Sequence, residues 1–178
     1  YRHIGPTTDI PAGDIGVGDR EIGYLFGQYK KLTQTFSGVL TGKNLLLGGA
    51  LGRFEATGNG LIYITNELLS DLETSLTGKR IVVSGTGKVG ACAAVKAHEM
   101  GAIIVAMNDS SATIVNEEGL DPYEVKKAKL EERKSLRDYA LENGIRILAS
   151  SEIWSVPCEI ALPCATQGEL DLEAAQTL

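Results

Sequence analysis

The stretch Ile81-Val-Val-Ser-Gly-Thr-Gly-Lys-Val-Gly90 decides the fold of this chain. A short apolar run leads into a turn whose glycines are Gly85, Gly87 and Gly90. In a dinucleotide-binding turn the first glycine permits the tight bend, the second lets the backbone approach a pyrophosphate, and the third lets helix and strand pack closely. The N–H groups at the start of the following helix then hold the phosphates. Because a plain strand–turn–helix shows the same glycines, the flanking segments must decide between the two interpretations.

The flanking segments alternate between strand and helix patterns, which predicts an α/β fold with a Rossmann-like, doubly wound parallel sheet and right-handed crossovers. Proline at the first helical position and Asn143-Gly144 at the other end bound a long charged helix. The expected elements are strand 80–84, helix 89–100, strand 103–107, a helix from Asp121-Pro122 to Asn143, strand 145–149 and strand 160–162.

Residues 1–45 have a different pattern and are expected to form the end of a preceding domain, with residues 46–178 forming the dinucleotide-binding domain. Asp19 is expected to cap a helix whose apolar residues are Ile22, Leu25, Phe26, Tyr29 and Leu32. Glycines between residues 38 and 52 predict a linker or hinge. A second helix is expected from Glu55 to Leu72, with a broad buried face formed by Leu61, Ile62, Ile64, Thr65, Leu68, Leu69 and Leu72.

Composition excludes several classes of protein. The chain has 178 residues and a net charge of −6, which argues against a nucleic-acid surface. No apolar run is long enough to cross a membrane. The three cysteines, Cys92, Cys158 and Cys164, fit a reducing compartment better than a disulfide framework. Neither their spacing nor the two separated histidines predict a metal site.

Asp14 is the residue most open to a chemical role. It lies between Gly13 and Gly16, just ahead of an amphipathic helix, on a backbone that can approach a small ligand closely. A reactive carboxylate upstream of a dinucleotide fold indicates an oxidoreductase. The residues alone leave a second interpretation open, in which Asp14 is a loop residue that bonds nearby N–H groups.

Five segments resemble one family, the hexameric glutamate dehydrogenases of microbes, and the resemblance runs from the first residue to the last. The segments are YRHIGP (1–6), PAGD (11–14), GVLTGK (38–43), RFEATG (53–58) and VPCEIALPCATQ (156–167). The resemblance implies that residues 1–45 end an α/β substrate-binding domain and that the cofactor domain is incomplete. Members are considerably longer, so the chain is expected to be an internal fragment. It is expected to be inactive alone, because the family's substrate lysines and distal serine have no counterpart in it.

The resemblance also implies roles for single residues. Asp14 is expected to move protons between the substrate nitrogen and water, with burial raising its pKa. Ala12 is expected to line the substrate pocket. Arg53 and Thr57 are expected near the nicotinamide, and Lys43 is expected on the surface. The other residues expected to bind the cofactor are Ser84, Gly85, Thr86, Gly87, Lys88, Val89, Ala165, Thr166 and Gln167.

The choice of nicotinamide depends on the end of the second strand. Asp109 lies where an acid usually holds the adenosine ribose hydroxyls, which favours NAD. However, Asn108-Asp-Ser-Ser111 resembles the Ser-Asp-Ser stretch of the NADP-using enzymes, in which hydroxyls accept a 2′-phosphate. Thr86 resembles that group too. We therefore expect NADP with Ser110 and Ser111 as phosphate contacts, and keep NAD as the alternative.

The resemblance implies a cytoplasmic, homohexameric glutamate dehydrogenase that interconverts L-glutamate with 2-oxoglutarate and ammonium. Two other functions stay open. One is a related dehydrogenase acting on an apolar amino acid. The other is a non-catalytic relative that binds nucleotide, because Phe54, Lys88 and Gly168 depart from the residues that the family usually has.

Overall fold

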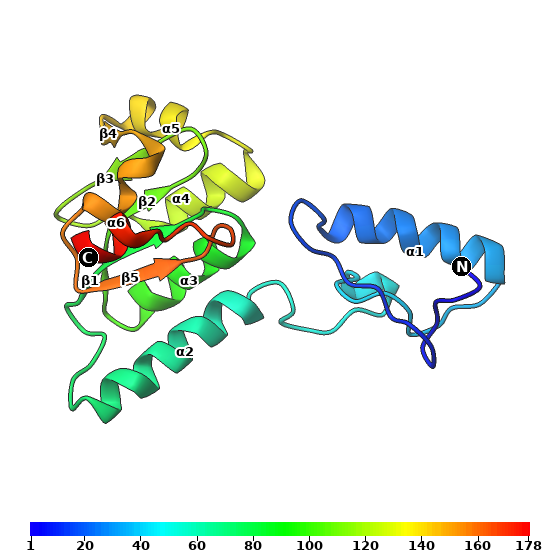
Figure 1. Ribbon diagram of the computed structural model, residues 1–178. Coiled ribbons are helices and arrows are strands. Elements are labelled where there is room, and N and C mark those ends of the chain that lie inside the picture. The colour runs from blue at the N-terminus through cyan, green and yellow to red at the C-terminus, as the bar shows by residue number, and fades with distance from the viewer. The chain divides into compact units, whose positions relative to one another are not determined.

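The computed structural model describes residues 1–178, which divide into two compact units, Tyr1–Phe54 and Glu55–Leu178 (Figure 1). Each unit has a core of its own, formed by separate clusters of buried apolar side chains. The expected boundary after residue 45 separates a substrate-binding part from a cofactor-binding part. The two compact units do not show which ligand each part binds, so this boundary stays a prediction.

Unit 1 is built around helix α1 (Asp19–Thr33) and a short 3₁₀ turn, η1 (Leu45–Leu47). Its core joins one face of α1 to the loop that follows, through Ile22, Phe26, Tyr29, Val39 and Leu40. The expected cap was wrong by one residue. Gly18 is the N-cap, and its N–H donates to the Glu21 carboxylate at 2.9 Å. Asp19 therefore begins the helix, where a negative charge favours the helix dipole.

Lys43 also differs from the expected surface lysine. Its ammonium donates to the carbonyls of Val39, at 2.8 Å, and Leu40. Leu40 has a left-handed backbone (φ 65°), a conformation that non-glycine residues rarely adopt. Lys43 therefore holds the loop that closes the core of unit 1.

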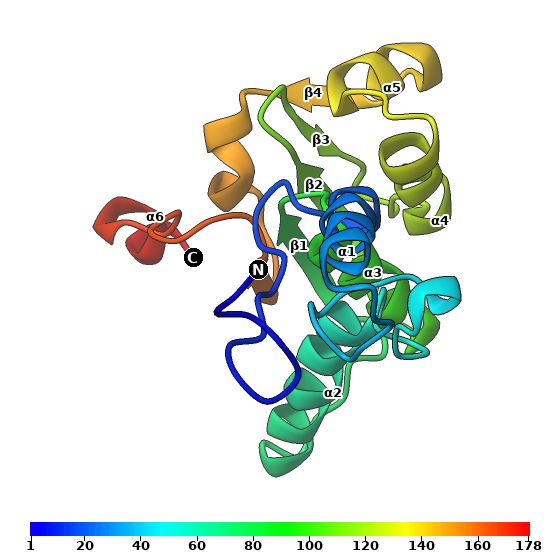
Figure 2. The ribbon, with the colours of Figure 1, turned by 90° about the vertical axis from the view of Figure 1, so that its right-hand side faces the viewer.

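Unit 2 contains a five-stranded sheet in the order β4-β3-β2-β1-β5 (Figure 2). Its strands are β1 (Arg80–Ser84), β2 (Ile103–Asn108), β3 (Thr113–Val115), β4 (Arg146–Leu148) and β5 (Ile160–Pro163). β1 pairs in parallel with both β2 and β5, which confirms the α/β class and the parallel core. The expectation of a fully parallel sheet was wrong, because β3 and β4 pair antiparallel and β3 was not predicted.

A tight turn at Asp109–Ala112 explains the antiparallel edge. The Asp109 N–H donates to the Ala112 carbonyl at 3.0 Å, and the Asp109 carboxylate accepts the N–H groups of Ser111 and Ala112. This is the self-bonded turn that aspartate favours. The turn reverses the chain directly after β2, so β3 returns beside it as a hairpin.

Both faces of the sheet are covered (Figure 2). Helices α2 (Ala56–Asp71), α3 (Lys88–Glu99), α4 (Pro122–Lys126) and α5 (Leu136–Asn143) supply one cluster of buried side chains. The 3₁₀ segment η3 (Ser150–Ser155) and helix α6 (Leu172–Thr177) cover the other face around Val82, Val105 and Trp154. None of these helices combines the length and apolar character needed to cross a membrane.

The broad buried face expected on α2 is narrower in the structure. Ile62 and Leu69 are buried, but Ile64 is 69% exposed and Leu72 66% exposed. The close contact of α2 with α3 is instead made at Gly58. A Cβ added there would lie 2.6 Å from the Ala93 nitrogen and the Val89 carbonyl oxygen.

Gly58→Ala is therefore expected to destabilise the fold by about 1–3 kcal/mol, because backbone atoms of α3 cannot yield to an added methyl group. Gly60→Ala is the matched control, since nothing lies within 4 Å of its added Cβ on the same helix. The control is expected to be neutral or stabilising, by up to about 1 kcal/mol, because alanine favours helix. Urea unfolding of both variants measures the difference. Equal stability of the two variants would contradict this packing.

The long charged helix expected from Pro122 to Asn143 is two helices. α4 runs into a π turn, η2 (Lys127–Glu131), and Arg133 then has a left-handed backbone (φ 57°). Ser135 starts α5, with its hydroxyl accepting the Asp138 N–H at 3.1 Å. The break places the first N–H groups of α5 at the turn that follows β2.

Candidate dinucleotide site

A cavity of about 1150 Å³ lies at the carboxyl ends of β1 and β2. Ligands of open parallel sheets bind at this end of the strands. Six segments line the cavity: the glycine turn, the end of β2, η2, η3, the loop after β5 and α6. The lining residues are Gly85, Thr86, Gly87, Asn108, Asp109, Ser110, Lys129, Leu130, Ser150, Ser151, Glu152, Ile153, Trp154, Ser155, Ala165, Thr166, Glu169, Asp171, Glu173, Ala174 and Thr177.

The glycine turn has the geometry that its sequence predicts. Gly85 has φ +74°, and a Cβ there would lie 2.8 Å from the Ala165 Cα. A Cβ on Gly90 would meet the Gly85 carbonyl oxygen at 1.7 Å, so the first turn of α3 lies directly against the glycine turn. Gly87 caps α3 and has open space around its Cβ position. Helix α3, which has twelve residues, therefore begins at a close-packed turn, but the space beside its N-cap Gly87 is open.

Thr86 supplies evidence that a ligand fits this cavity. Its side chain is 2% exposed, and its hydroxyl has no hydrogen-bond partner within the protein. Buried hydroxyls are rarely left unpaired, because each loses its bonds to water. Thr86 also lines the cavity, beside the N-terminus of α3. A ligand with phosphate oxygens would satisfy the hydroxyl and the helix N-terminus together.

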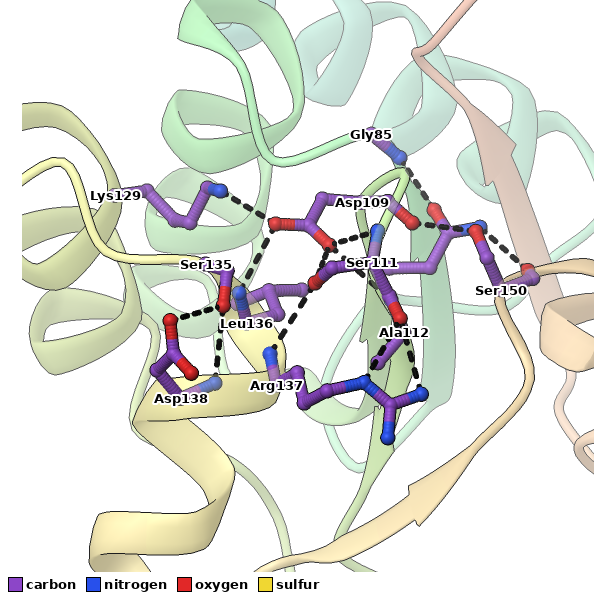
Figure 3. A network of polar contacts seen from close by, with 11 residues as sticks. Gly85, Asp109, Ser111, Ala112, Lys129, Ser135, Leu136, Arg137, Asp138 and Ser150 are labelled. Carbon is purple, nitrogen blue, oxygen red and sulfur yellow. Dashed lines mark hydrogen bonds and ion pairs between the residues drawn. The ribbon is translucent and has the colours of Figure 1, made fainter.

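Asp109 is fully engaged by protein groups (Figure 3). One carboxylate oxygen accepts the N–H and hydroxyl of Ser111 and the N–H of Ala112. The other accepts the Lys129 ammonium at 2.5 Å and the Leu136 N–H at 3.0 Å. Both oxygens therefore have partners, and the carboxylate joins the β2–β3 turn to η2 and to the start of α5.

The pKa of Asp109 reflects this network. Burial by itself raises the pKa, but the hydrogen bonds from Lys129, Ser111 and Leu136 together lower it from 3.8 to about 2. A carboxyl whose folded pKa is depressed adds stability above its unfolded pKa, and this stability is lost as the pH falls through the folded pKa. Asp109 thus stabilises the fold at neutral pH, and its contribution disappears between about pH 4 and pH 2.

We therefore expect Asp109→Asn to flatten the acid dependence of stability. The stability of the unchanged protein should lose on the order of 2 kcal/mol more than that of the variant between about pH 5 and pH 2, as measured by urea unfolding. Asp71→Asn, at the exposed end of α2, serves as the control and should keep the full dependence. An unchanged acid dependence in Asp109→Asn would show that the network does not stabilise the ionised carboxylate.

The two serines that follow Asp109 differ in position. Ser110 is exposed and lines the cavity. Ser111 does not line it, because its hydroxyl donates to Asp109 and accepts the Arg137 N–H at 3.3 Å. Lys129 lines the cavity and was not predicted. The sequence offered no signal that separated it from the other lysines of the same charged segment.

The loop after β5 is held by Ser84 and Glu169. The buried Ser84 hydroxyl donates to the Glu169 carboxylate and accepts the Cys164 N–H at 3.1 Å. Glu169 also accepts the Ala165 N–H at 3.0 Å, and its carbonyl accepts the Trp154 indole N–H at 3.2 Å. Ser84 thus fixes the loop and does not line the cavity.

Gly168 and Cys164 lie in the same loop. Gly168 has φ +71°. Glycine adopts this left-handed backbone without strain, so Gly168 suits the shape of the loop. Burial raises the pKa of the Cys164 thiol to about 12, so the thiol is protonated and unreactive at neutral pH.

In unit 1, Asp14 and Ala12 are both exposed. The Asp14 carboxylate accepts the Ile15 N–H at 2.8 Å, and its carbonyl accepts the Val17 N–H at 2.8 Å. The burial expected of Asp14 is absent, because the residue lies on an exposed turn of this unit. Arg53, at the end of unit 1, is exposed as well.

Apart from Arg53, which belongs to unit 1, the residues predicted to bind the cofactor fall into two groups. The members of the first line the cavity, and these are Gly85, Thr86, Gly87, Asp109, Ser110, Ala165 and Thr166. The members of the second belong to unit 2 but lie outside the cavity lining, and these are Thr57, Ser84, Lys88, Val89, Ser111 and Gln167. Direct contact with a cofactor stays a prediction for both groups.

The fold and cavity define an α/β protein of the Rossmann-like, nucleotide-binding class. The family model "Glutamate/Leucine/Phenylalanine/Valine dehydrogenase" matches residues 48–178. The model "Glu/Leu/Phe/Val dehydrogenase, dimerisation domain" matches residues 1–31. The chain belongs to this family of dehydrogenases, which confirms the resemblance.

Known relatives cover the whole chain. It is 50% identical over 183 residues to the NADP-specific glutamate dehydrogenase of Salmonella typhimurium, covering 100% of this chain and 40% of that protein. Identity to the Escherichia coli K12 enzyme of the same name is 48% over 183 residues, with the same coverage. The structure of glutamate dehydrogenase from Plasmodium falciparum matches with a TM-score of 0.93 and 40% identity, covering 99% of this chain and 39% of that one. The chain thus spans about 40% of the length of these relatives.

Proposed function

We propose that the protein containing this chain is an NADP-linked glutamate dehydrogenase, which interconverts L-glutamate with 2-oxoglutarate and ammonium. Relatives named NADP-specific glutamate dehydrogenase, at 48% to 50% identity over the whole chain, support this. One observation carries the choice of NADP. Protein groups occupy both carboxylate oxygens of Asp109, while the ammonium-bearing Lys129 lines the cavity beside it.

The preference for NADP rests on charge. An acid that holds ribose hydroxyls needs a free oxygen, but both Asp109 oxygens already accept bonds from the protein. Lys129 brings a cation to the same place, and Ser110 brings an exposed hydroxyl. An ammonium and a hydroxyl suit a 2′-phosphate, which carries negative charge and strong acceptor oxygens. We therefore assign Lys129 and Ser110 to the phosphate, and Asp109 to the positioning of Lys129.

The remaining cofactor roles follow the cavity. The N-terminus of α3 and the Thr86 hydroxyl would hold the pyrophosphate, as the unpaired hydroxyl supports. Ala165 and Thr166, beyond β5, are assigned to the nicotinamide half, and Arg53 and Thr57 keep the roles predicted for them. When bound, the nicotinamide supplies the hydride acceptor for oxidation of the amino acid.

We assign proton transfer to Asp14 and a substrate contact to Ala12. Oxidative deamination releases a proton from the substrate nitrogen and takes up water, so a carboxylate that exchanges protons with both is suited to it. The exposure of Asp14 on its turn gives the carboxylate access to water. The hydrogen bond that the Asp14 carboxylate accepts from the Ile15 N–H orients the side chain and leaves the carboxylate able to accept a proton.

We further propose a homohexamer. The match of residues 1–31 to the family's dimerisation domain supports self-association. A Thermus thermophilus relative, 31% identical, is described as a hetero-hexameric glutamate dehydrogenase. Light scattering on the protein encoded by the uninterrupted reading frame should give six times the mass of its single chain. A monomer or dimer would contradict the hexamer.

The substrate is tested by following reduction of NADP⁺ with that same protein. L-Glutamate should be oxidised at least about 100-fold more efficiently than L-leucine, L-valine or L-phenylalanine, because pockets that pair a charged group discriminate strongly. Faster turnover of an apolar amino acid would assign the chain to another branch of the family. Tight cofactor binding with no turnover of any of the four would favour the non-catalytic relative.

A further inference from the structure

Asn108, the last residue of β2, joins two walls of the cavity. Its side-chain oxygen accepts the Gly85 N–H at 2.7 Å, and its side-chain nitrogen donates to the Ser150 carbonyl at 2.9 Å. Gly85 belongs to the glycine turn and Ser150 begins η3, and both line the cavity with Asn108. The half-buried side-chain amide of Asn108 therefore links the glycine turn after β1 to η3, which covers the face of the sheet opposite α3.

The two partners fix which way the amide points. Gly85 offers a donor and Ser150 offers an acceptor, so the amide must present its oxygen to the first and its nitrogen to the second. A carboxylate would keep the first bond and lose the second. An aliphatic side chain of similar size would lose both.

Ser150 is itself held in place. Its carbonyl also accepts the Thr113 hydroxyl at 3.1 Å, and its hydroxyl donates to the Asp109 carbonyl. Figure 3 shows the Ser150 side chain directed toward the backbone of Asp109, just after the end of β2. The amide of Asn108 is thus anchored to a rigid point and can position the turn.

Gly85 is the point at which position matters most. Its left-handed backbone and the nearby Ala165 backbone leave the residue little freedom. The bond to Asn108 occupies its N–H and satisfies a donor that would otherwise lie half-buried without a partner. The backbone conformation of Gly85 therefore sets the positions of Thr86 and of the N-terminus of α3, which follow it directly.

We propose that Asn108 is a positioning residue for the dinucleotide: it sets the glycine turn, and through the turn the groups that hold the pyrophosphate. The inference rests on the proposed function, because it names a determinant of cofactor affinity in the same site. It assigns to Asn108 an effect on cofactor binding and none on the chemical step.

The test compares Asn108→Leu and Asn108→Ala with the unchanged protein encoded by the uninterrupted reading frame. NADPH dissociation constants come from fluorescence titration, and kcat and KM from reductive amination of 2-oxoglutarate. Both variants should bind NADPH about tenfold more weakly, a change of about 1.4 kcal/mol. The kcat at saturating NADPH and the KM for 2-oxoglutarate should stay within about twofold, as should every constant of the control Asn143→Leu. Asn143 loses a comparable bond, to the Tyr139 carbonyl at 2.8 Å, at the exposed end of α5.

A folded variant that binds NADPH as tightly as the unchanged protein would overturn the inference, and so would a fall in kcat with unchanged affinity. Failure of both variants to fold would also count against it, because the inference places Asn108 in the turn geometry and not in the core. If the unchanged protein binds neither NADPH nor NADH, the proposed function itself fails.

Discussion

Asp14→Asn, in the protein encoded by the uninterrupted reading frame, is expected to lower kcat for L-glutamate oxidation by about 100- to 10,000-fold. Asparagine has nearly the same shape, and its side-chain oxygen can still accept the Ile15 N–H that Asp14 accepts at 2.8 Å. The amide carries no proton that it can give or take near neutral pH. The turn should therefore survive while proton transfer is lost.

Asp9→Asn is the matched control, because Asp9 is an exposed carboxylate of the same unit with no assigned role. Its kcat should equal that of the unchanged protein, and neither variant should change the dissociation constant of NADPH. A kcat within about threefold of the unchanged value in Asp14→Asn would leave Asp14 as a loop residue that bonds its neighbours. Proton transfer would then belong to another group.

Lys129→Gln is expected to remove most of the preference for NADP. Charge-assisted bonds to a phosphate contribute about 1.5–3 kcal/mol, so kcat/KM for NADPH should fall by roughly 10- to 150-fold. Losing the ammonium also leaves one Asp109 oxygen with the Leu136 N–H as its remaining partner, so this oxygen can accept a bond from the ribose hydroxyls of NADH. The kcat/KM for NADH should therefore stay the same or rise.

Lys127→Gln controls for loss of one positive charge in the same segment. Lys127 pairs with Glu132 at 3.9 Å on an exposed surface and does not line the cavity. Its ratio of NADPH to NADH efficiency should match the unchanged protein. An equal fall in efficiency with both cofactors in Lys129→Gln, with the ratio unchanged, would show that Lys129 supports the fold of the site and does not contact the 2′-phosphate.

The sequence predicted the centre of the sheet well, for a physical reason. β1, β2 and β5 pair in parallel, and β1 and β2 are covered on both faces, so they appear as continuous apolar runs. The short β3 cannot be predicted from periodicity, because three residues give none. Its signal was the Asp109–Ala112 turn between two apolar segments, a pattern that also marks hairpins.

The site was predictable only in part, because it depends on contacts between distant segments. The glycine turn and Asp109 follow from local pattern. Lys129 reaches Asp109 from η2, 20 residues further along the chain. The Leu136 N–H reaches Asp109 because the helical segment breaks near Arg133, a residue whose type does not indicate a left-handed backbone. The bridge made by Asn108 likewise needs Ser150, which is remote in sequence. The glycine neighbours of Asp14 and the family resemblance indicate its role, but neither predicts that the residue is exposed.

The most direct test of the central claim is a comparison of NADPH with NADH in one reaction. The protein encoded by the uninterrupted reading frame is supplied with 2-oxoglutarate and ammonium, and oxidation of each reduced cofactor is followed to give kcat/KM. The arrangement of Lys129, Ser110 and the engaged Asp109 predicts at least about tenfold higher efficiency with NADPH. Equal or higher efficiency with NADH would contradict it and would make Asp109 a ligand of the ribose.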